Sequence, residues 1–140
     1  MASALYNSAK KKLLQGSIAL DTDTIKVALT TSTYVPSIDN HTFFSDITNE
    51  VTGTGYSAGG ATLGSVVVTQ DNTNDLAYFD AADTVWTTST ITARYAILYK
   101  STGTAATSPL IGYYDFTADK VSDGASFTIT WNVGGLLKLT

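Results

Sequence analysis

The C-terminal segment, residues 126–139 with the sequence SFTITWNVGGLLKL, constrains the fold more than any other part of the chain. From Phe127 to Val133 every second residue is aromatic or β-branched, and the residues between them are polar. This period of two is typical of a β-strand with one buried and one exposed face. If the register does not slip, Leu137 and Leu139 continue the buried parity, and the glycine pair before them allows a bulge or a close backbone approach. A strand this long needs neighbours, so we expect earlier segments to supply the sheet that it completes.

Several earlier segments carry the composition of strands, bounded by turn residues. The pattern predicts strands at residues 25–30, 63–69, 76–80, 84–87, 93–100 and 110–117. Residues 71–75 form the predicted turn of a hairpin, whereas 101–108 and 118–125 are predicted loops. Residues 93–100 are apolar at both parities, which predicts a central strand. The last three strands are therefore expected to form an antiparallel meander.

The rest of the chain is less regular. Residues 2–15 predict a short helix in which Leu5, Ala9 and Leu13 share one face. Gly16 is the expected C-cap residue. Two placements remain open: the helix packs on its own sheet, or it docks as an arm on a neighbouring subunit. Residues 31–60 form a long irregular region, with one short helical turn expected around Phe43 and Phe44.

A single domain is expected for 140 residues. We divide it into an N-terminal helix or arm, residues 1–16, and a single β domain, residues 17–140. The predicted fold class is mainly β: a small antiparallel β-sandwich or barrel with one short N-terminal helix.

Composition argues against several classes of function. Charged residues make up only 14% of the chain and the net charge is −4, which argues against a nucleic-acid-binding face. The chain has no cysteine, so it has neither a disulfide nor a thiol nucleophile. It contains no apolar run long enough to cross a membrane, and residues 1–16 lack the apolar core of a signal peptide. We therefore expect synthesis in a cytoplasm and neither nucleic acid nor membrane as a partner.

Residues that could carry chemistry are few. His41 is the only histidine and Glu50 the only glutamate, so a histidine pair for a metal and a pair of glutamates are both excluded. Residues 71–75 and 21–23 are rich in oxygen atoms but lack the ligand set of an EF-hand, and turns explain them better. We predict that the protein is not an enzyme and needs no metal or cofactor.

The aromatic residues raise the alternative of a carbohydrate site, because Tyr and Trp rings can stack on ligands. The strand parity of Tyr95, Tyr99, Phe127 and Trp131 instead indicates a core. Tyr113 and Tyr114 must point to opposite faces, which leaves one of them as a candidate for exposure.

Short stretches spread over nearly the whole chain carry a resemblance to a known family. They are residues 4–7, 13–14, 16–18, 21–29, 38–41, 43–44, 49–56, 103–110 and 128–132. In these stretches the chain resembles a family of small tailed-bacteriophage virion proteins of the capsid decoration, or cement, type. None of the stretches is a catalytic motif, so the resemblance transfers no binding residues.

The resemblance implies a non-enzymatic virion protein, made in the host cytoplasm, that binds and stabilises the capsid exterior. Its implied partner is the major capsid protein, and self-association as a homotrimer is expected. Lys10, Lys11 and Lys12 form the only basic cluster of an acidic chain. This cluster favours contact with an acidic patch of the shell. The predicted contact residues are Leu5, Lys10, Lys11, Lys12, Leu13, Phe43 and Phe44. The alternative function is a tail- or fibre-associated module that adheres to host glycans, and a small hydrolase is disfavoured.

Overall fold

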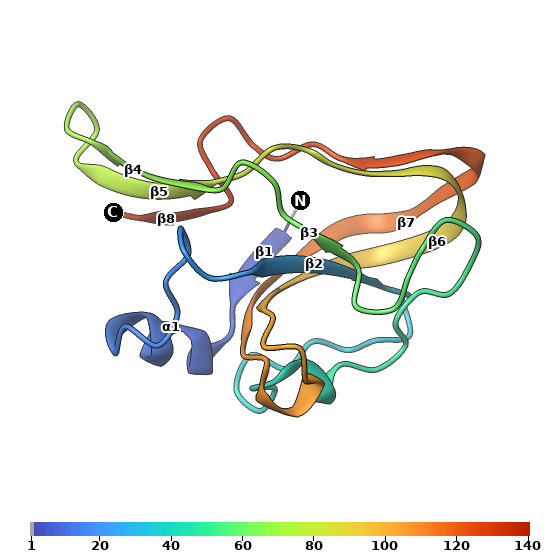
Figure 1. Ribbon diagram of the computed structural model, residues 1–140, viewed down its shortest axis with the longest axis horizontal. Helices are drawn as coiled ribbons and strands as arrows, with labels where there is room; N and C mark the ends of the chain where they lie inside the picture. Colours follow the sequence, from blue (N-terminus) through green and yellow to red (C-terminus); the bar gives the residue numbers. More distant parts are fainter. Residues whose placement is uncertain (1) are drawn as a thin grey trace.

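The computed structural model describes residues 2–140 and is mainly β, with two antiparallel sheets and one short α-helix near the N-terminus (Figure 1). A five-stranded sheet has the order β1-β7-β6-β2-β3, and a three-stranded sheet has the order β4-β5-β8. The elements are β1 (Ala2–Leu5), α1 (Asn7–Leu14), β2 (Ile25–Thr30), β3 (Ala61–Thr62), β4 (Val67–Asp71), β5 (Leu76–Asp80), β6 (Thr84–Lys100), β7 (Leu110–Ile129) and β8 (Leu137–Leu139). Two 3₁₀ turns, Phe44–Asp46 and Ala105–Thr107, lie in the connections. The predicted fold class, a small antiparallel β-sandwich with one helix, is confirmed.

The centre of the molecule is a two-stranded ribbon formed by β6 and β7. The two strands pair antiparallel from Thr84 opposite Ile129 to Tyr99 opposite Leu110. At the middle of the ribbon, residues 116–119 of β7 lie opposite Arg94 alone, and such a bulge bends the strands. Arg94 holds the bend, because its Nε lies 2.5 Å from Oδ1 of Asp115 and its Nη2 lies 3.2 Å from Oδ2. The ribbon also folds over at the right of Figure 1 and so contributes to both layers of the sandwich.

This ribbon corrects the sequence prediction for the second half of the chain. Residues 84–87 and 93–100 belong to one strand, and residues 118–125, a predicted loop, continue β7. Those residues are polar because most of their side chains face solvent on a ribbon with only one neighbour. The exception is Ser122, whose buried hydroxyl lies 2.7 Å from that of Ser89.

Two apolar clusters hold the layers together. The main core lies between the layers and includes Trp86, Ala96, Leu98 and Ile111. A second cluster covers the outer face of the five-stranded sheet and is formed by Tyr6, Ala9, Ala28, Tyr34, Ile97, Tyr99 and Leu110. Because neighbouring residues of β6 enter different clusters, both faces of residues 96–99 are buried. The predicted central position of this segment is confirmed, since it lies between β7 and β2.

The N-terminal helix is shorter than the sequence predicted. Residues 2–5 form β1, which pairs with β7, and Leu5 lies opposite Gly112. A Cβ atom at Gly112 would lie 2.9 Å from the carbonyl oxygen of Ala4, so the glycine permits this close pairing. The predicted stripe of Leu5, Ala9 and Leu13 therefore does not exist on one helix, because sheet pairing outweighs the weak helix preference of a short segment.

The helix that does form packs on its own sheet through Ala9, which is fully buried. Gly16, with φ of 69°, follows the helix end. The amide of Gly16 bonds to the carbonyl of Leu13 at 3.1 Å and that of Ser17 to the carbonyl of Lys12 at 2.9 Å. These two bonds form a Schellman motif, so the predicted capping role of Gly16 is confirmed.

The C-terminal strand is divided in two. Phe127, Ile129 and Trp131 are buried as predicted, but β7 ends at Ile129 and β8 belongs to the other sheet. Val133 is 96% exposed and Leu139 is 65% exposed, so the prediction of one buried face through residue 139 was wrong. The reason is the glycine pair, which makes a turn instead of a bulge: Gly135 has φ of 91° and its amide bonds to the carbonyl of Asn132 at 2.8 Å.

Other predicted elements agree with the structure. Strand β2 has the predicted bounds, and β4 with β5 forms the predicted hairpin, although β4 begins at Val67 instead of residue 63. Oδ1 of Asp71 accepts hydrogen bonds from the amides of Thr73 and Asn74 at 3.0 and 3.1 Å. This oxygen-rich segment is thus an Asx-stabilised turn. The helical turn expected around Phe43 and Phe44 corresponds to the 3₁₀ turn Phe44–Asp46.

Candidate partner-binding seam

One side of the sandwich is sealed by the glycine-containing segment at residues 50–63, which we call the sealed seam. This segment bonds to β2 through the amide of Val51 and the carbonyl of Leu29, at 2.9 Å. It then reaches the other layer, where the amide of Thr90 donates to the carbonyl of Thr54 at 2.9 Å. The carboxylate of Glu50 fixes the segment, since its Oε1 accepts from the Tyr56 hydroxyl at 2.8 Å and the Gly59 amide at 2.6 Å. Both layers are therefore tied together on this side.

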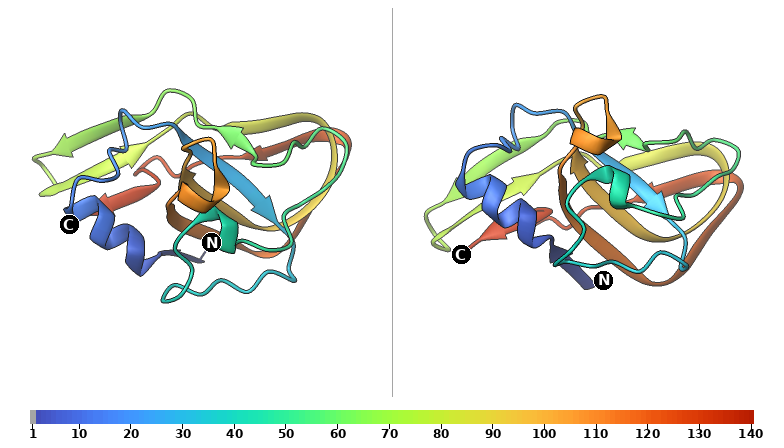
Figure 2. Two further views of the ribbon diagram at one scale, coloured as in Figure 1. Left: turned by 60° about the horizontal axis from the view of Figure 1, so that its bottom comes forward. Right: turned by 90° about the horizontal axis from the view of Figure 1, so that it is seen from below.

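The opposite side has no such cover, and we call it the open seam. Its lower edge is β1, which among residues 2–140 pairs with β7 alone. Its upper edge consists of β8 and the second half of β7. Within residues 2–140, β8 pairs only with β5, and the second half of β7 pairs only with β6. The right-hand view of Figure 2 shows β1 at the lower rim of the molecule. Two sheet edges therefore face the same side of the protein without a sealing segment.

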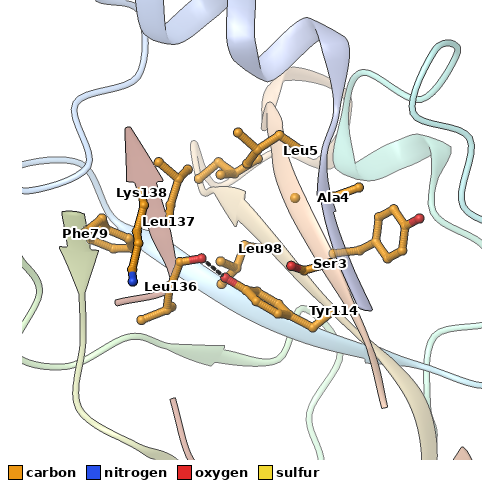
Figure 3. A pocket seen from close by; sticks show the side chains of 12 residues that line it. Ser3, Ala4, Leu5, Phe79, Leu98, Tyr114, Leu136, Leu137 and Lys138 are labelled. Carbon is orange, nitrogen blue, oxygen red and sulfur yellow. Dashed lines mark hydrogen bonds between the residues drawn. The ribbon is translucent and has the colours of Figure 1, made fainter. Parts of the chain in front are cut away.

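A cavity of about 160 Å³, lined by both apolar and polar groups, lies in the open seam between β1 and β8 (Figure 3). Ser3, Ala4 and Leu5 line one side, and Leu136, Leu137 and Lys138 line the other. The remaining lining residues are Phe79, Leu98, Ile111, Gly112, Tyr113 and Tyr114. Lys138 is the one charged residue of this set. The hydroxyl of Tyr114 donates to the carbonyl of Leu136, and burial raises the pKa of this tyrosine, so its hydroxyl stays neutral near pH 7.

The backbone of β1 also faces the open seam. The amide of Tyr6 donates to the carbonyl of Ile111 at 3.1 Å, so Tyr6 belongs to the hydrogen-bonded set of residues. Bonding alternates along an antiparallel strand, and the N–H and C=O groups of Ser3 and Leu5 therefore point away from β7. The strand sequence Ala-Ser-Ala-Leu contains neither the charge nor the proline that commonly protects an edge strand. This edge can accept another strand.

A second hollow continues the open seam beside the upper half of β7. It has a volume of about 300 Å³ and is lined by Phe116, Lys120, Val121 and residues 126–130. Lys120 is the charged residue of this lining. Both hollows of the open seam thus combine apolar walls with a lysine and no carboxylate.

The structure disperses the predicted contact residues. Leu5 lies in the open seam, and Leu13 packs against the main core. Lys10 and Lys11 are exposed on α1, outside the hollows of the open seam. Nζ of Lys12 lies 5.0 Å from the ring centre of Phe43, so the structure does bring these two residues together. Phe44 stacks on Tyr99 with a centroid distance of 4.1 Å and therefore serves packing.

Sequence reasoning missed Ser3, Lys120 and Lys138. The uncharged stretch at residues 2–5 was the one available signal, because an unprotected edge strand has this composition. The two lysines could not be found, since residues 120 and 138 meet the open seam only through the pairing of distant strands.

His41 belongs to a chain of hydrogen bonds that joins the start of α1 to the loop above it. The Tyr6 and Tyr34 hydroxyls lie 2.9 Å apart, and Tyr34 Oη lies 2.8 Å from Nδ1 of His41. The amide of Ser37 also points at Nδ1, at 3.4 Å, so Nδ1 is assigned as the acceptor of the Tyr34 proton. Burial raises the pKa of Tyr34 to about 12 and that of Tyr6 still further. Both tyrosines stay neutral near pH 7. The row of hydrogen bonds therefore acts as a structural tether between Tyr6 and His41.

The aromatic residues considered for a carbohydrate site are largely internal. Tyr99, Phe127 and Trp131 are buried, as their strand parity predicted. Tyr114 is buried in the main core, and Tyr113 packs between Tyr6 and Tyr95.

Residues 2–140 contain neither a cluster of metal ligands nor a helix that could span a membrane. No group of three or more His, Asp or Glu side chains in this part of the chain could hold a metal ion. None of the helices found there has the length and apolarity needed to cross a bilayer.

Comparison with known proteins gives no match to a family model, a curated protein or a solved structure. The resemblance to phage virion proteins therefore stays a prediction from the sequence.

Proposed function

We propose that this chain is a non-enzymatic virion protein that binds and stabilises the exterior of a phage capsid. The open seam supports an assembly role, because it offers an unprotected sheet edge beside a cavity. Such a surface suits the binding of another polypeptide and does not require a reactive group. The major capsid protein as the partner comes from the sequence resemblance.

We assign the contact with the shell to the exposed lysines of α1, which leaves the open seam for self-association. Lys10 and Lys11 project from the helix, whereas Lys12 lies over the Phe43 ring. They belong to the single basic cluster of a chain with net charge −4, so an acidic patch on the shell would attract this end of the molecule. Exposed charges are screened over about 10 Å at 0.1 M salt, and this contribution should therefore weaken as salt rises.

We also propose that the protein self-associates as a homotrimer. Head-to-tail contacts that close give cyclic rings, and a stable interface buries roughly 800 Å² per partner. Repetition of weak contacts over a symmetric lattice then raises the strength of attachment through avidity.

The alternative, a tail- or fibre-associated module that adheres to host glycans, has less support. Such a module would need exposed aromatic rings, and Tyr99, Phe127 and Trp131 are buried.

Labelling on intact particles tests the location. Antibody-linked gold directed at the protein should decorate the capsid shell, and label confined to the tail would contradict the proposal. The helix contact is tested with a Lys10→Gln, Lys11→Gln double variant, which keeps the Lys12–Phe43 contact. Its binding to capsids that lack the protein should be weaker than that of the wild type at low salt. The two proteins should converge at high salt, while their urea unfolding midpoints agree throughout.

A further inference from the structure

We propose that a second copy of this chain occupies the open seam, with strand β4 of one copy added to strand β1 of the next. This inference rests on the self-association proposed above and does not depend on the identity of the shell protein. It assigns the two surfaces that meet: a donor edge on β4 and an acceptor edge on β1.

The donor edge is an exposed strand on a projecting hairpin. β4 is the outermost strand of the three-stranded sheet and lies at the upper left of Figure 1. Val67 and Val68 are 46% and 47% exposed, although they are adjacent β-branched residues in a strand. Half of the backbone groups of an edge strand point away from its one partner, and β4 has no charge or proline before Asp71 to deter a further strand. The edge is therefore both apolar and free to pair.

The acceptor edge matches this donor in shape. Ser3 and Leu5 offer outward N–H and C=O groups, and the cavity beside them has a volume of about 160 Å³. An apolar cavity of about 150 Å³ can hold a benzene molecule, so an aliphatic side chain of valine size fits. Val67 and Val68 point to opposite faces of β4, so a register that places this pair beside the cavity directs one of the two side chains into it. An added β4 strand thus supplies backbone bonds and an apolar side chain together.

Charge favours the same pairing. Residues 61–83, which include the hairpin, contain Asp71, Asp75, Asp80 and Asp83 but neither lysine nor arginine. The hollows of the open seam carry Lys138 and Lys120 and no carboxylate. Lys138 also shares a hollow with Asp71 of its own hairpin, so Lys120 is the lysine that attracts the acidic hairpin of another copy.

The geometry of the two edges fixes the type of assembly. β4 and β1 are different surfaces of one chain, so their contact is head-to-tail and leaves a free donor and a free acceptor at each end. Repetition closes into a ring when the rotation between copies allows it. A closed trimer uses every donor and every acceptor.

Disulfide trapping tests the pairing directly, because the native chain has no cysteine. Single-cysteine variants at Ser3 or Ala4 are mixed with single-cysteine variants at Val67, Val68 or Thr69, and the mixtures are oxidised. Bridged residues must have Cα atoms roughly 4.4–6.8 Å apart, so only one register of a true strand pair will react well. The expected result is a heterodimeric disulfide that exceeds either homodimer. Val35→Cys, at an exposed residue outside both edges, is the matched control.

Sedimentation of the untreated protein separates this inference from the proposal beneath it. The wild type should be oligomeric, Val68→Lys should be monomeric, and Val35→Lys should resemble the wild type. A monomeric wild type at every concentration would overturn both the self-association and this interface. An oligomer that survives Val68→Lys, with no trapped pair above the Val35→Cys control, would overturn this interface alone. Failure to bind capsids would affect neither result.

Discussion

The substitution Gly60→Ala is expected to damage the sealed seam severely. Gly60 has φ of 71°, and a Cβ atom there would lie 1.9 Å from the carbonyl oxygen of Val27 and 2.7 Å from Cα of Ala28. Both contacts are to backbone, so no side-chain rotation can relieve them. β3 would have to move away from β2, which endangers the pair of Val27 and Ala61 and the 2.9 Å bond from the Leu63 amide to the Ile25 carbonyl.

The size of the effect follows from two contributions. A left-handed backbone costs a residue with a Cβ atom about 1–2 kcal/mol relative to glycine. Loss of one or two backbone hydrogen bonds adds about 0.5–1.5 kcal/mol for each. The expected loss in free energy of unfolding is therefore about 1.5–5 kcal/mol, a large part of the roughly 5–15 kcal/mol typical of a domain.

Gly124→Ala is the matched control for the backbone contribution. Gly124 has φ of 65°, but nothing lies within 4 Å of a Cβ atom built there. Its substitution should cost about 1–2 kcal/mol from conformation alone. Urea unfolding of the two variants, with unchanged slopes, gives the comparison. If Gly60→Ala costs no more than Gly124→Ala, the close packing of the sealed seam does not contribute to stability and the reasoning fails.

Two further predictions concern the tyrosines. Tyr34→Phe should lower the free energy of unfolding by about 1–3 kcal/mol, because the buried Tyr6 hydroxyl and Nδ1 of His41 lose their shared partner. The control Tyr113→Phe removes a hydroxyl that has no hydrogen bond inside residues 2–140, so it should cost less than about 0.5 kcal/mol. Equal urea midpoints for Tyr34→Phe and Tyr113→Phe would contradict the role of the tether in stability. Burial raises the pKa of Tyr34 and of Tyr99 from 10.0 to about 12, so the folded state holds these protons more tightly than the unfolded chain. Stability should thus be intact below about pH 10 and fall between about pH 10 and 12, and a flat profile of unfolding free energy over that window would contradict this linkage.

Local patterns predicted those elements whose neighbours are close in sequence or whose two faces differ clearly. β2 was found with its bounds, and the hairpin of β4 and β5 was found from its turn residues. The bend of the ribbon was missed because residues 118–125 have the polar composition of a loop while forming strand pairs. β1 was missed because its four residues carry no strand pattern, and its formation depends on the room that Gly112 leaves in β7.

The position of the open seam depends on which strands pair with each other, and amino-acid composition does not reveal this pairing. Its walls come from β1 and β8 at opposite ends of the chain, together with β5, β6 and β7. No local pattern states which edge of a sheet stays unpaired, and Lys138 has a defined neighbour only after β8 joins β5. Lys10, Lys11 and Lys12 were predicted as contact residues from their charge, which indicates exposure but not proximity to a sheet edge.

The β6–β7 ribbon also determines the order in which the chain can assemble during synthesis. The pair of Tyr99 and Leu110 spans a short loop and can form soon after residue 110 leaves the ribosome. Thr84 must wait for Ile129, so Trp86 and Ile91 stay without their cross-strand partners until Phe127 and Ser122 have been made. Between the synthesis of Asp115 and that of Ile129, the nascent protein thus carries a paired lower half and an unpaired upper half. The apolar side chains of that upper half are the ones a chaperone would meet.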